Sequence, residues 1–185
     1  MFLFGCVHTS EHPSLSTIIT DDLIDASGKK VDRSSLFSAP YVLLYFSAHT
    51  CPPCQRFTPK FVKFYNAFGK DRPFNVIFVS SDKTEEKMFN YMRQTQMPWV
   101  ATSHQGALAK TLTKEFCKSG IPNLVLLDLQ GNIIADCYKN RRYQGPQQVL
   151  DLLLKKIGRS VPKAKVERKK DDLSSCSTEG KGPCG

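Results

Sequence analysis

Residues 41–46 are apolar at every position, with no alternation of polar and apolar side chains. This pattern is typical of a strand that is buried on both faces, and such strands occur in sheets that helices cover on both sides. Residues 74–80 and 123–128 show a similar pattern and predict two further central strands. Residues 133–137 follow a tight-turn sequence at 130–132, so they predict a hairpin with the third strand.

Helical periodicity lies between the predicted strands. Aromatic side chains recur at spacings of three and four residues and form one apolar stripe: Phe57, Phe61, Phe64, Tyr65 and Phe68. Similar stripes predict helices over 84–94, 108–116 and 146–157. A β-branched stretch at 15–19 is typical of a strand, and a turn sequence at 26–29 predicts a β-hairpin before the first central strand. This order of elements predicts an α/β fold with a mixed central sheet and helices on both faces.

The periodic pattern fades towards both ends of the chain. We therefore expect a flexible leader at 1–13, one domain at 14–158 and a basic, disordered tail at 159–185. The tail carries seven Lys or Arg residues against four Asp or Glu, and the whole chain has a formal net charge of +9. A basic run can bind nucleic acid, but no interleaved aromatic side chains support base stacking here, so we expect no nucleic-acid partner.

The apolar runs and the cysteine count restrict the compartment. No apolar run approaches the roughly 18 residues of a membrane span. The apolar opening at 1–7 lacks the basic region and the cleavage site of a signal peptide. Seven cysteines are an odd number and too few for a disulfide scaffold. We expect a cytoplasmic protein, with the nucleus as the alternative, in which a cysteine pair is reactive or metal-bound rather than structural.

The sequence Cys51-Pro52-Pro53-Cys54 lies between the first buried strand and the helix with the aromatic stripe. The first turn of a helix has N–H groups without partners and carries the positive end of the helix dipole, so a sulfur there is stabilised as the thiolate. The short spacing lets Cys51 attack a disulfide and Cys54 resolve the mixed disulfide. Because neither proline has an N–H, we expect the amides of Cys54 and Gln55 to be the main donors to the sulfur. The thiolate is then less strongly stabilised, so we expect a protein better suited to reducing its substrates than to oxidising them.

The remaining cysteines indicate weaker chemistry. A structural zinc site needs further ligands at close spacing, which the chain does not offer, so we expect no metal. Cys6, Cys176 and Cys184 lie on the predicted flexible arms, where regulatory or adventitious disulfides are the alternative to free thiols. Cys117 is expected at a helix end, with oxidation near the active face as the alternative, and Cys137 is expected in a strand.

Two prolines strengthen the case for a reactive pair. Pro59 interrupts the aromatic-striped helix, where a proline normally costs about 3 kcal/mol. Pro122 follows Gly120 and Ile121 at the start of the third strand and is a candidate for a cis peptide bond. Such a bond would place the backbone of Ile121 beside the sulfurs, where it could hydrogen-bond an extended substrate chain as an added strand.

In combination these features resemble the thioredoxin fold, and more closely its tryparedoxin and nucleoredoxin branch. The resemblance extends over residues 15–157, and it is carried by residues 45–48 before the Cys-Pro-Pro-Cys sequence, by 56–59 with 64–65, by 97–99, and by 79–82 with 85–86. It implies a thioredoxin-like three-layer sandwich with an N-terminal β-hairpin extension, and the activity of a thiol–disulfide oxidoreductase.

The resemblance also implies roles for single residues. Cys51 is the nucleophile, Cys54 the resolving thiol, Pro122 the cis-proline, and Ile121 beside it contacts substrate. Tyr45 stands where thioredoxins place a buried acid. Proton transfer would then rely on water or on one of three side chains: Asp82, Glu85 and Glu86.

The chain departs from the family at the residue before the first cysteine. The family usually has a tryptophan there, whereas this chain has Thr50, preceded by His49. Trp99, the sole tryptophan, is expected to lie half-buried near a loop, where it would join Thr50 in contacting substrate as a replacement platform. An imidazolium at His49 close to Cys51 would favour the thiolate and respond to pH near neutrality, and a solvent-facing loop histidine is the alternative.

Two functions of different classes fit this sequence. The first is an enzyme that reduces protein disulfides, is recharged by a thiol or a reductase, acts as a monomer and needs no cofactor beyond its Cys51–Cys54 disulfide. The second is a binding module with the same fold, in which cysteine chemistry is weak or regulatory because Thr50 replaces the tryptophan. The intact cysteine pair together with Pro122 favours the enzyme.

Overall fold

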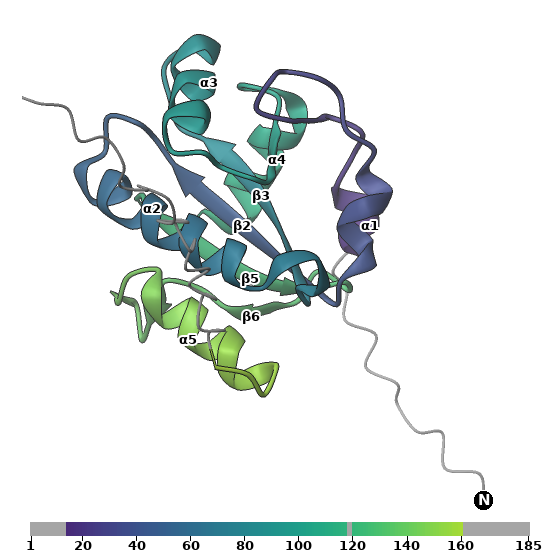
Figure 1. Ribbon diagram of the computed structural model, residues 1–185, viewed down its shortest axis with the longest axis vertical. Helices are drawn as coiled ribbons and strands as arrows, with labels where there is room; N and C mark the ends of the chain where they lie inside the picture. The colour runs from purple at the N-terminus through teal and green to yellow at the C-terminus, as the bar shows by residue number, and fades with distance from the viewer. Residues whose placement is uncertain (1–13, 118–119, 161–185) are drawn as a thin grey trace, which may run out of the picture.

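The computed structural model describes residues 14–117 and 120–160, which form a central sheet with helices on both faces (Figure 1). Within this part of the chain the sheet has six strands in the order β1-β4-β3-β2-β5-β6. The strands are β1 Leu23–Ile24, β2 Tyr41–Ser47, β3 Phe74–Ser80, β4 Val100–Thr102, β5 Asn123–Asp128 and β6 Ile133–Ala135. β2 is parallel to β3 and antiparallel to β5, so the sheet is mixed, as predicted.

Helices and short elements connect these strands. The α-helices in the described residues are α1 Leu15–Ile18, α2 Pro52–Ala67, α3 Glu85–Gln94, α4 Ala107–Phe116 and α5 Gln147–Lys156. Two 3-10 helices, η1 Arg33–Ser38 and η2 Gly69–Asp71, precede β2 and β3. A separate hairpin of β7 Tyr138–Lys139 and β8 Arg142–Tyr143 comes before α5. The predicted thioredoxin-like α/β fold is confirmed.

The side chains of β2 alternate between two apolar clusters, one on each face of the sheet. Leu43 and Tyr45 belong to the cluster formed with α2, α3 and α5. Val42, Leu44 and Phe46 belong to the cluster formed with α1, η1 and α4. A strand with apolar packing on both sides has no polar face, which explains the unbroken apolar run in the sequence. This packing fixes β2 near the centre of the sheet, and with it the start of the loop that carries the cysteines.

The N-terminal region differs in part from the prediction. The β-branched stretch at 15–19 forms α1 and not a strand, because one helical turn buries Leu15 and Ile19 in the second cluster. Packing of this kind outweighs a weak β preference. The predicted turn is present at Gly28, which has a φ of 85°, and Ile24 bridges Lys30 across it. β1 also pairs with β4, which holds the hairpin against the edge of the sheet.

Several short strands were not predicted. β4 has three residues, and β7 and β8 have two each, so none is long enough to show a period-two pattern. β6 ends at Ala135, two residues before the predicted end. No helix in residues 14–117 and 120–160 is long and apolar enough to span a membrane. The predicted leader, residues 161–185 of the predicted tail, and the cysteines at 6, 176 and 184 lie outside the described residues.

Candidate active site

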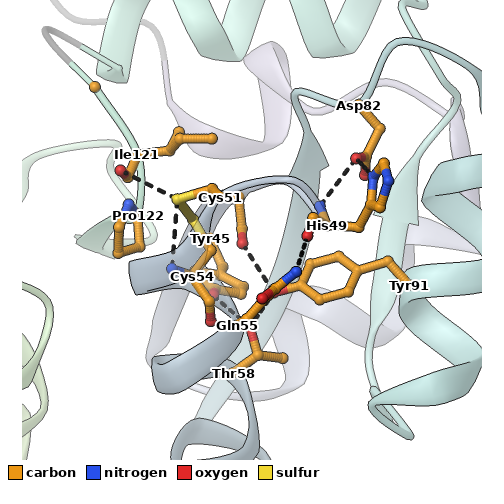
Figure 2. The surroundings of a disulfide bond; sticks show 12 residues. Tyr45, His49, Cys51, Cys54, Gln55, Thr58, Asp82, Tyr91, Ile121 and Pro122 are labelled. Carbon is orange, nitrogen blue, oxygen red and sulfur yellow. Dashed lines mark hydrogen bonds and ion pairs between the residues drawn. A yellow bond between two sulfur atoms is a disulfide. The ribbon is translucent and has the colours of Figure 1, made fainter.

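The end of β2 and the start of β5 bring the two predicted motifs together. In the antiparallel ladder Phe46 pairs with Asn123, so the loop that leaves β2 begins beside residues 121–122. α2 then starts with Cys51 as its N-cap residue. Figure 2 shows Cys51 next to Ile121 and Pro122 at this edge of the sheet.

The two cysteines of the motif differ in exposure. They form a disulfide, with Cα atoms 5.2 Å apart. Cys51 is partly exposed, whereas Cys54 has 0% exposure. The backbone N–H of Cys54 donates to Sγ of Cys51 at 3.4 Å. An external disulfide therefore has access to the sulfur of Cys51 and not to that of Cys54.

The prediction that Gln55 supplies a second amide to the sulfur is wrong. Its backbone N–H donates to the carbonyl oxygen of Cys51 at 3.0 Å, which is the first regular hydrogen bond of α2. Its side-chain amide donates to the carbonyl oxygen of His49 and ties the loop to the helix. Among the described residues, Cys54 alone supplies a backbone N–H to Sγ of Cys51.

The Ile121–Pro122 peptide bond is cis, as predicted. The carbonyl oxygen of Ile121 lies 3.6 Å from Sγ of Cys51. On the other side of the proline, the hydroxyl of Tyr143 donates to the carbonyl oxygen of Pro122 at 2.7 Å. Partial burial raises the pKa of Tyr143 from 10.0 to about 12, so its hydroxyl remains a donor to a higher pH than that of an ordinary tyrosine. β8 thereby holds the cis-proline segment in place.

Four hydroxyl groups behind Cys54 form what we call the hydroxyl cluster: Tyr45, Ser47, Thr58 and Tyr91. Oγ1 of Thr58 donates to the carbonyl oxygen of Cys54 at 2.9 Å. It also lies 2.7 Å from Oη of Tyr45 and 2.5 Å from Oη of Tyr91. A hydroxyl has one hydrogen, so both tyrosines must donate to Thr58. Tyr91 then accepts from Oγ of Ser47 at 3.3 Å, which gives every hydroxyl a partner.

The hydroxyl cluster changes the interpretation of Tyr45. Burial raises the pKa of Tyr45 far above its ordinary value. Its hydroxyl is bonded to Thr58, and it makes no hydrogen bond to either sulfur. Tyr45 therefore supports the backbone of Cys54 through Thr58. Sequence reasoning missed the role of Thr58, although a threonine four residues after a helical residue is placed to bond that residue's carbonyl.

His49 points away from the sulfurs and towards Asp82 (Figure 2). Nδ1 of His49 lies 2.5 Å from Oδ1 of Asp82, and the backbone N–H of His49 donates to the same oxygen at 2.9 Å. Oδ2 of Asp82 accepts from the hydroxyl of Ser80 at 2.9 Å, and Nε2 of His104 donates to the carbonyl oxygen of Asp82 at 2.8 Å. These bonds around a buried carboxylate fix the active-site loop against the end of β3.

Three other candidates lie on the surface. Glu85 and Glu86 are exposed in the first turn of α3, where acidic side chains suit the helix dipole. Within the described part of the chain, neither forms a hydrogen bond or an ion pair with the active-site loop. Thr50 is exposed and directly precedes Cys51.

Trp99 is buried, and the prediction that it forms a surface platform is wrong. It is 4% exposed, and its ring packs against Phe61, Tyr65 and Tyr45, with 4.7 Å between the ring centroids of Trp99 and Phe61. Trp99 directly precedes β4, which no sequence pattern reveals. Without that strand the inward direction of the ring could not be predicted.

The other two described cysteines are free thiols. Cys117 caps the C-terminus of α4, as predicted, and burial raises its pKa. Cys137 lies just beyond β6, and its sulfur is 3.0 Å from the backbone nitrogen of Leu124. Burial raises the pKa of Cys137 to about 12. In the part of the chain that is described, no group of three or more His, Cys, Asp or Glu residues could hold a metal ion.

A family model described as thioredoxin-like matches residues 40–133, just over half of the chain. The chain belongs to the thioredoxin-like family. The matched segment begins directly before β2 and includes both the Cys-Pro-Pro-Cys sequence and the cis-proline.

Relatives of this thioredoxin-like chain include nucleoredoxins and tryparedoxins. A probable nucleoredoxin 1 from Arabidopsis thaliana is 39% identical over 124 residues, which cover 66% of this chain and 21% of that protein. The structure of tryparedoxin from Trypanosoma brucei is 31% identical, with a TM-score of 0.59, and the match covers 74% of this chain and 90% of that one. A tryparedoxin II complexed with glutathionylspermidine is 28% identical, with a TM-score of 0.61 and coverage of 74% and 91%. The chain spans 21% to 28% of the length of the curated relatives it matches.

Proposed function

We propose that this thioredoxin-like chain is a thiol–disulfide oxidoreductase that reduces the disulfides of other proteins. The observation that carries the proposal is the pairing of a partly exposed Cys51 with a buried Cys54 at the start of α2, beside the cis Pro122. The likeness to nucleoredoxins and tryparedoxins supports it.

The two cysteines divide the reaction between them. The thiolate of Cys51 attacks one sulfur of the substrate disulfide, forms a mixed disulfide and releases the other substrate sulfur, which takes a proton from water. Cys54 then loses its proton and attacks Sγ of Cys51. This step releases the second substrate thiol and forms the Cys51–Cys54 disulfide. Two electrons have then passed from the protein dithiol to the substrate.

The surroundings of Cys51 favour the reducing direction. The N-terminus of α2 and the single amide of Cys54 stabilise its thiolate, but Pro52 and Pro53 supply no N–H groups. We therefore expect weaker thiolate stabilisation than in a strong oxidant. A measured Cys51 pKa near 3.5, the value of such an oxidant, would contradict this direction.

Other groups serve substrate binding and proton transfer. The backbone of Ile121 is assigned to an extended substrate chain, and the exposed Thr50 directly before Cys51 is assigned to contact with the substrate. Asp82 is engaged with His49 and Ser80, so we assign the proton of Cys54 to water.

The reduced state must be regenerated by an electron donor. We assign this step to a low-molecular-weight thiol or a reductase, and the glutathionylspermidine found with tryparedoxin II supports the former. A reducing compartment such as the cytoplasm suits this direction of electron flow, and a monomer is sufficient for the chemistry.

A binding module is the second candidate. Thr50 is exposed where the family usually has a tryptophan, so the surface beside Cys51 differs from that of the redox enzymes. In this candidate the same surface recognises a partner, and the cysteines regulate binding.

Insulin reduction, with dithiothreitol as the electron donor, separates the two candidates. We expect turnover by the wild type and a loss on the order of a thousandfold in Cys51→Ser, because the nucleophile is removed. Cys117→Ser is the matched control, and it should retain activity because Cys117 lies outside the Cys51–Cys54 pair. Turnover equal to that of Cys51→Ser, in a wild type with intact circular dichroism, would support the binding module instead.

A further inference from the structure

A groove of about 390 Å³ opens beside the cysteine motif. Its apolar lining consists of Pro53 and Phe57 from α2, Pro122, Tyr143 and Pro146. Pro53 lies between the two cysteines in sequence, and Pro122 follows Ile121, whose carbonyl oxygen is 3.6 Å from Sγ of Cys51. The groove therefore lies beside the cysteine motif, between α2, the cis-proline and the loop that leads into α5.

Two cations line the groove on the side of α2. Arg56 and Lys60 are four residues apart, so they lie on the same face of the helix. Both are exposed, and neither forms a hydrogen bond or ion pair with any described residue. Among the described residues, no acidic side chain lines the groove. The nearby acids Asp136 and Asp151 line a separate hollow.

A basic hairpin, formed by β7 and β8, adjoins the groove through Tyr143. Asn140 and Arg141 form its two-residue turn, and both have positive φ, 51° and 63°, as a tight hairpin turn requires. Tyr143 anchors the hairpin to the cis-proline through its bond to the carbonyl oxygen of Pro122. Lys139, Arg141 and Arg142 are exposed on it. Lys139 lines the separate hollow that holds Asp136 and Asp151, so Arg56 and Lys60 are the cations that line the groove among the described residues.

We propose that this groove binds an extended segment of the protein substrate that carries Asp or Glu side chains close to the reacting cysteine. Arg56 and Lys60 are then residues that determine specificity for acidic disulfide substrates. This inference rests on the proposed reductase function and names its substrate class. The apolar lining packs against the substrate chain, and Arg56 and Lys60 form ion pairs with its carboxylates.

The spacing of the cations defines where the acidic residues must lie. A helix rises about 1.5 Å per residue, so Arg56 and Lys60 are roughly 7 and 13 Å from Cys51 along the axis of α2. An extended chain advances about 3.3 Å per residue. Substrate carboxylates two to four residues from the reacting cysteine therefore reach the cations.

Three disulfide-linked peptides test this preference. They share one sequence and differ only in two positions, two and four residues from the cysteine, which hold Glu, Gln or Lys. We expect the reduced wild type to reduce the Glu peptide about five times faster than the Gln peptide, and the Lys peptide more slowly. The difference should shrink in 0.5 M salt, at a screening length of roughly 4 Å.

Variants locate the effect on the groove. In R56Q/K60Q the ratio of the Glu rate to the Gln rate should fall to about one. Lys63→Gln is the matched control, since Lys63 is an exposed lysine of α2 outside the groove, and the ratio should stay near five. Equal rates for all three peptides at low salt, or an unchanged ratio in R56Q/K60Q, overturns the proposal. The proposal is also overturned if glutathione disulfide is reduced faster than the peptides and the three peptides are reduced at equal rates. The groove would then bind a small anion and not a chain.

A binding measurement separates this proposal from the reductase function. Fluorescently labelled peptides with Ser in place of Cys cannot react, and their affinity for the oxidised protein is measured by fluorescence anisotropy. Tighter binding of the Glu peptide, lost in R56Q/K60Q, supports the groove even if no peptide is reduced. In that event the reductase function fails, and the groove's preference for acidic peptides stands. Equal binding of the Glu and Gln peptides contradicts the groove.

Discussion

Cys51 and Cys137 lie on either side of the segment that begins β5, and each accepts a hydrogen bond from a backbone N–H. For Cys51 the donor is Cys54, with a nitrogen–sulfur distance of 3.4 Å. For Cys137 the donor is Leu124, and the distance is shorter, 3.0 Å. The hydrogen bond alone would therefore predict Cys137 to be the more acidic thiol. The pKa of Cys137 is instead raised to about 12, chiefly by burial.

Burial and the position relative to a helix terminus, and not the hydrogen bond, decide the acidity of these two thiols. Cys51 is partly exposed and caps the N-terminus of α2, where the helix dipole favours a thiolate. Cys137 has 0% exposure and follows β6, so it does not cap a helix. Its thiol donates to the carbonyl oxygen of Leu124 at 3.5 Å and accepts from the backbone N–H of the same residue. These two bonds satisfy the backbone of Leu124 beyond the end of the β5–β6 pairing at Ala135.

Alkylation of the reduced protein tests the comparison most strongly. At pH 8 a thiol with a pKa of about 12 is ionised at roughly one part in ten thousand, against about a tenth for a thiol at the ordinary value of 9.0. We expect iodoacetamide to modify Cys51 at least about a thousandfold faster than Cys137, as followed by mass spectrometry of peptides. Comparable rates for the two cysteines in the folded protein would remove the basis of the comparison.

Thr58 is the centre of the hydroxyl cluster that supports Cys54, and a substitution can remove its hydroxyl. Thr58→Val leaves the buried hydroxyl of Tyr45 without its acceptor and leaves that of Tyr91 with Ser47 alone, so the free energy of unfolding should fall by about 2–3 kcal/mol in urea titrations. The triple variant that adds Tyr45→Phe and Tyr91→Phe removes the unpaired donors and should recover part of the loss. A loss below about 0.5 kcal/mol in Thr58→Val, as for an ordinary surface change, contradicts the hydrogen-bond assignment.

Alkaline pH should weaken the folded state through Cys137. Its pKa is about 12 in the folded protein against an ordinary value of 9.0, so between these values the unfolded state holds fewer protons. The free energy of unfolding then falls as pH rises, by about 1.4 kcal/mol per pH unit for one group. The contribution is complete below pH 9 and lost by about pH 12.

Urea titrations of the wild type and Cys137→Ala at pH 8, 9, 10 and 11 measure this effect. The slope against pH should be less steep in the variant by about one proton. Cys117→Ala serves as a control, because Cys117 is only partly buried and should change the slope less. Identical slopes in the wild type and Cys137→Ala would show that the buried thiol does not titrate in the unfolding reaction as proposed.

Substitution of His49 should have the smallest effect on the free energy of unfolding. His49→Ala removes the ring bond to Asp82 but keeps the backbone bond, so we expect a loss of about 1 kcal/mol in the free energy of unfolding. The pKa of Cys51, measured by thiolate absorbance, should not change, because the ring faces Asp82 and not the sulfur (Figure 2). A shift of that pKa would restore the electrostatic role predicted for His49.

The local motifs could be predicted because their signals are contained in a few adjacent residues. The Cys51–Cys54 pair, the helix that follows it and the cis bond at Pro122 are all of this kind. The central strands were equally clear, because a short and unbroken apolar run between turn signals is typical of a strand buried on both faces.

Contacts between distant segments could not be predicted in this way. The bond between Thr58 and Tyr91 joins α2 to α3 and exists only once both helices cover the same face of the sheet. The burial of Trp99 depends on β4, which is too short to show a pattern. The tie between Tyr143 and Pro122 depends on the hairpin of β7 and β8, whose strands have two residues each.

The apolar packing on both faces of β2 has a consequence for strand alignment. Where one face is polar, a slip of one residue exposes the apolar face and is strongly disfavoured. A slip of β5 against β2 would here exchange one apolar cluster for another, so burial penalises the error less. Such a slip would still move Ile121 by about 3.4 Å along the strand, away from Cys51. The bonds from Cys137 to Leu124 and from Tyr143 to Pro122 both hold the start of β5, so they act against a misaligned, inactive isomer with a normal fold.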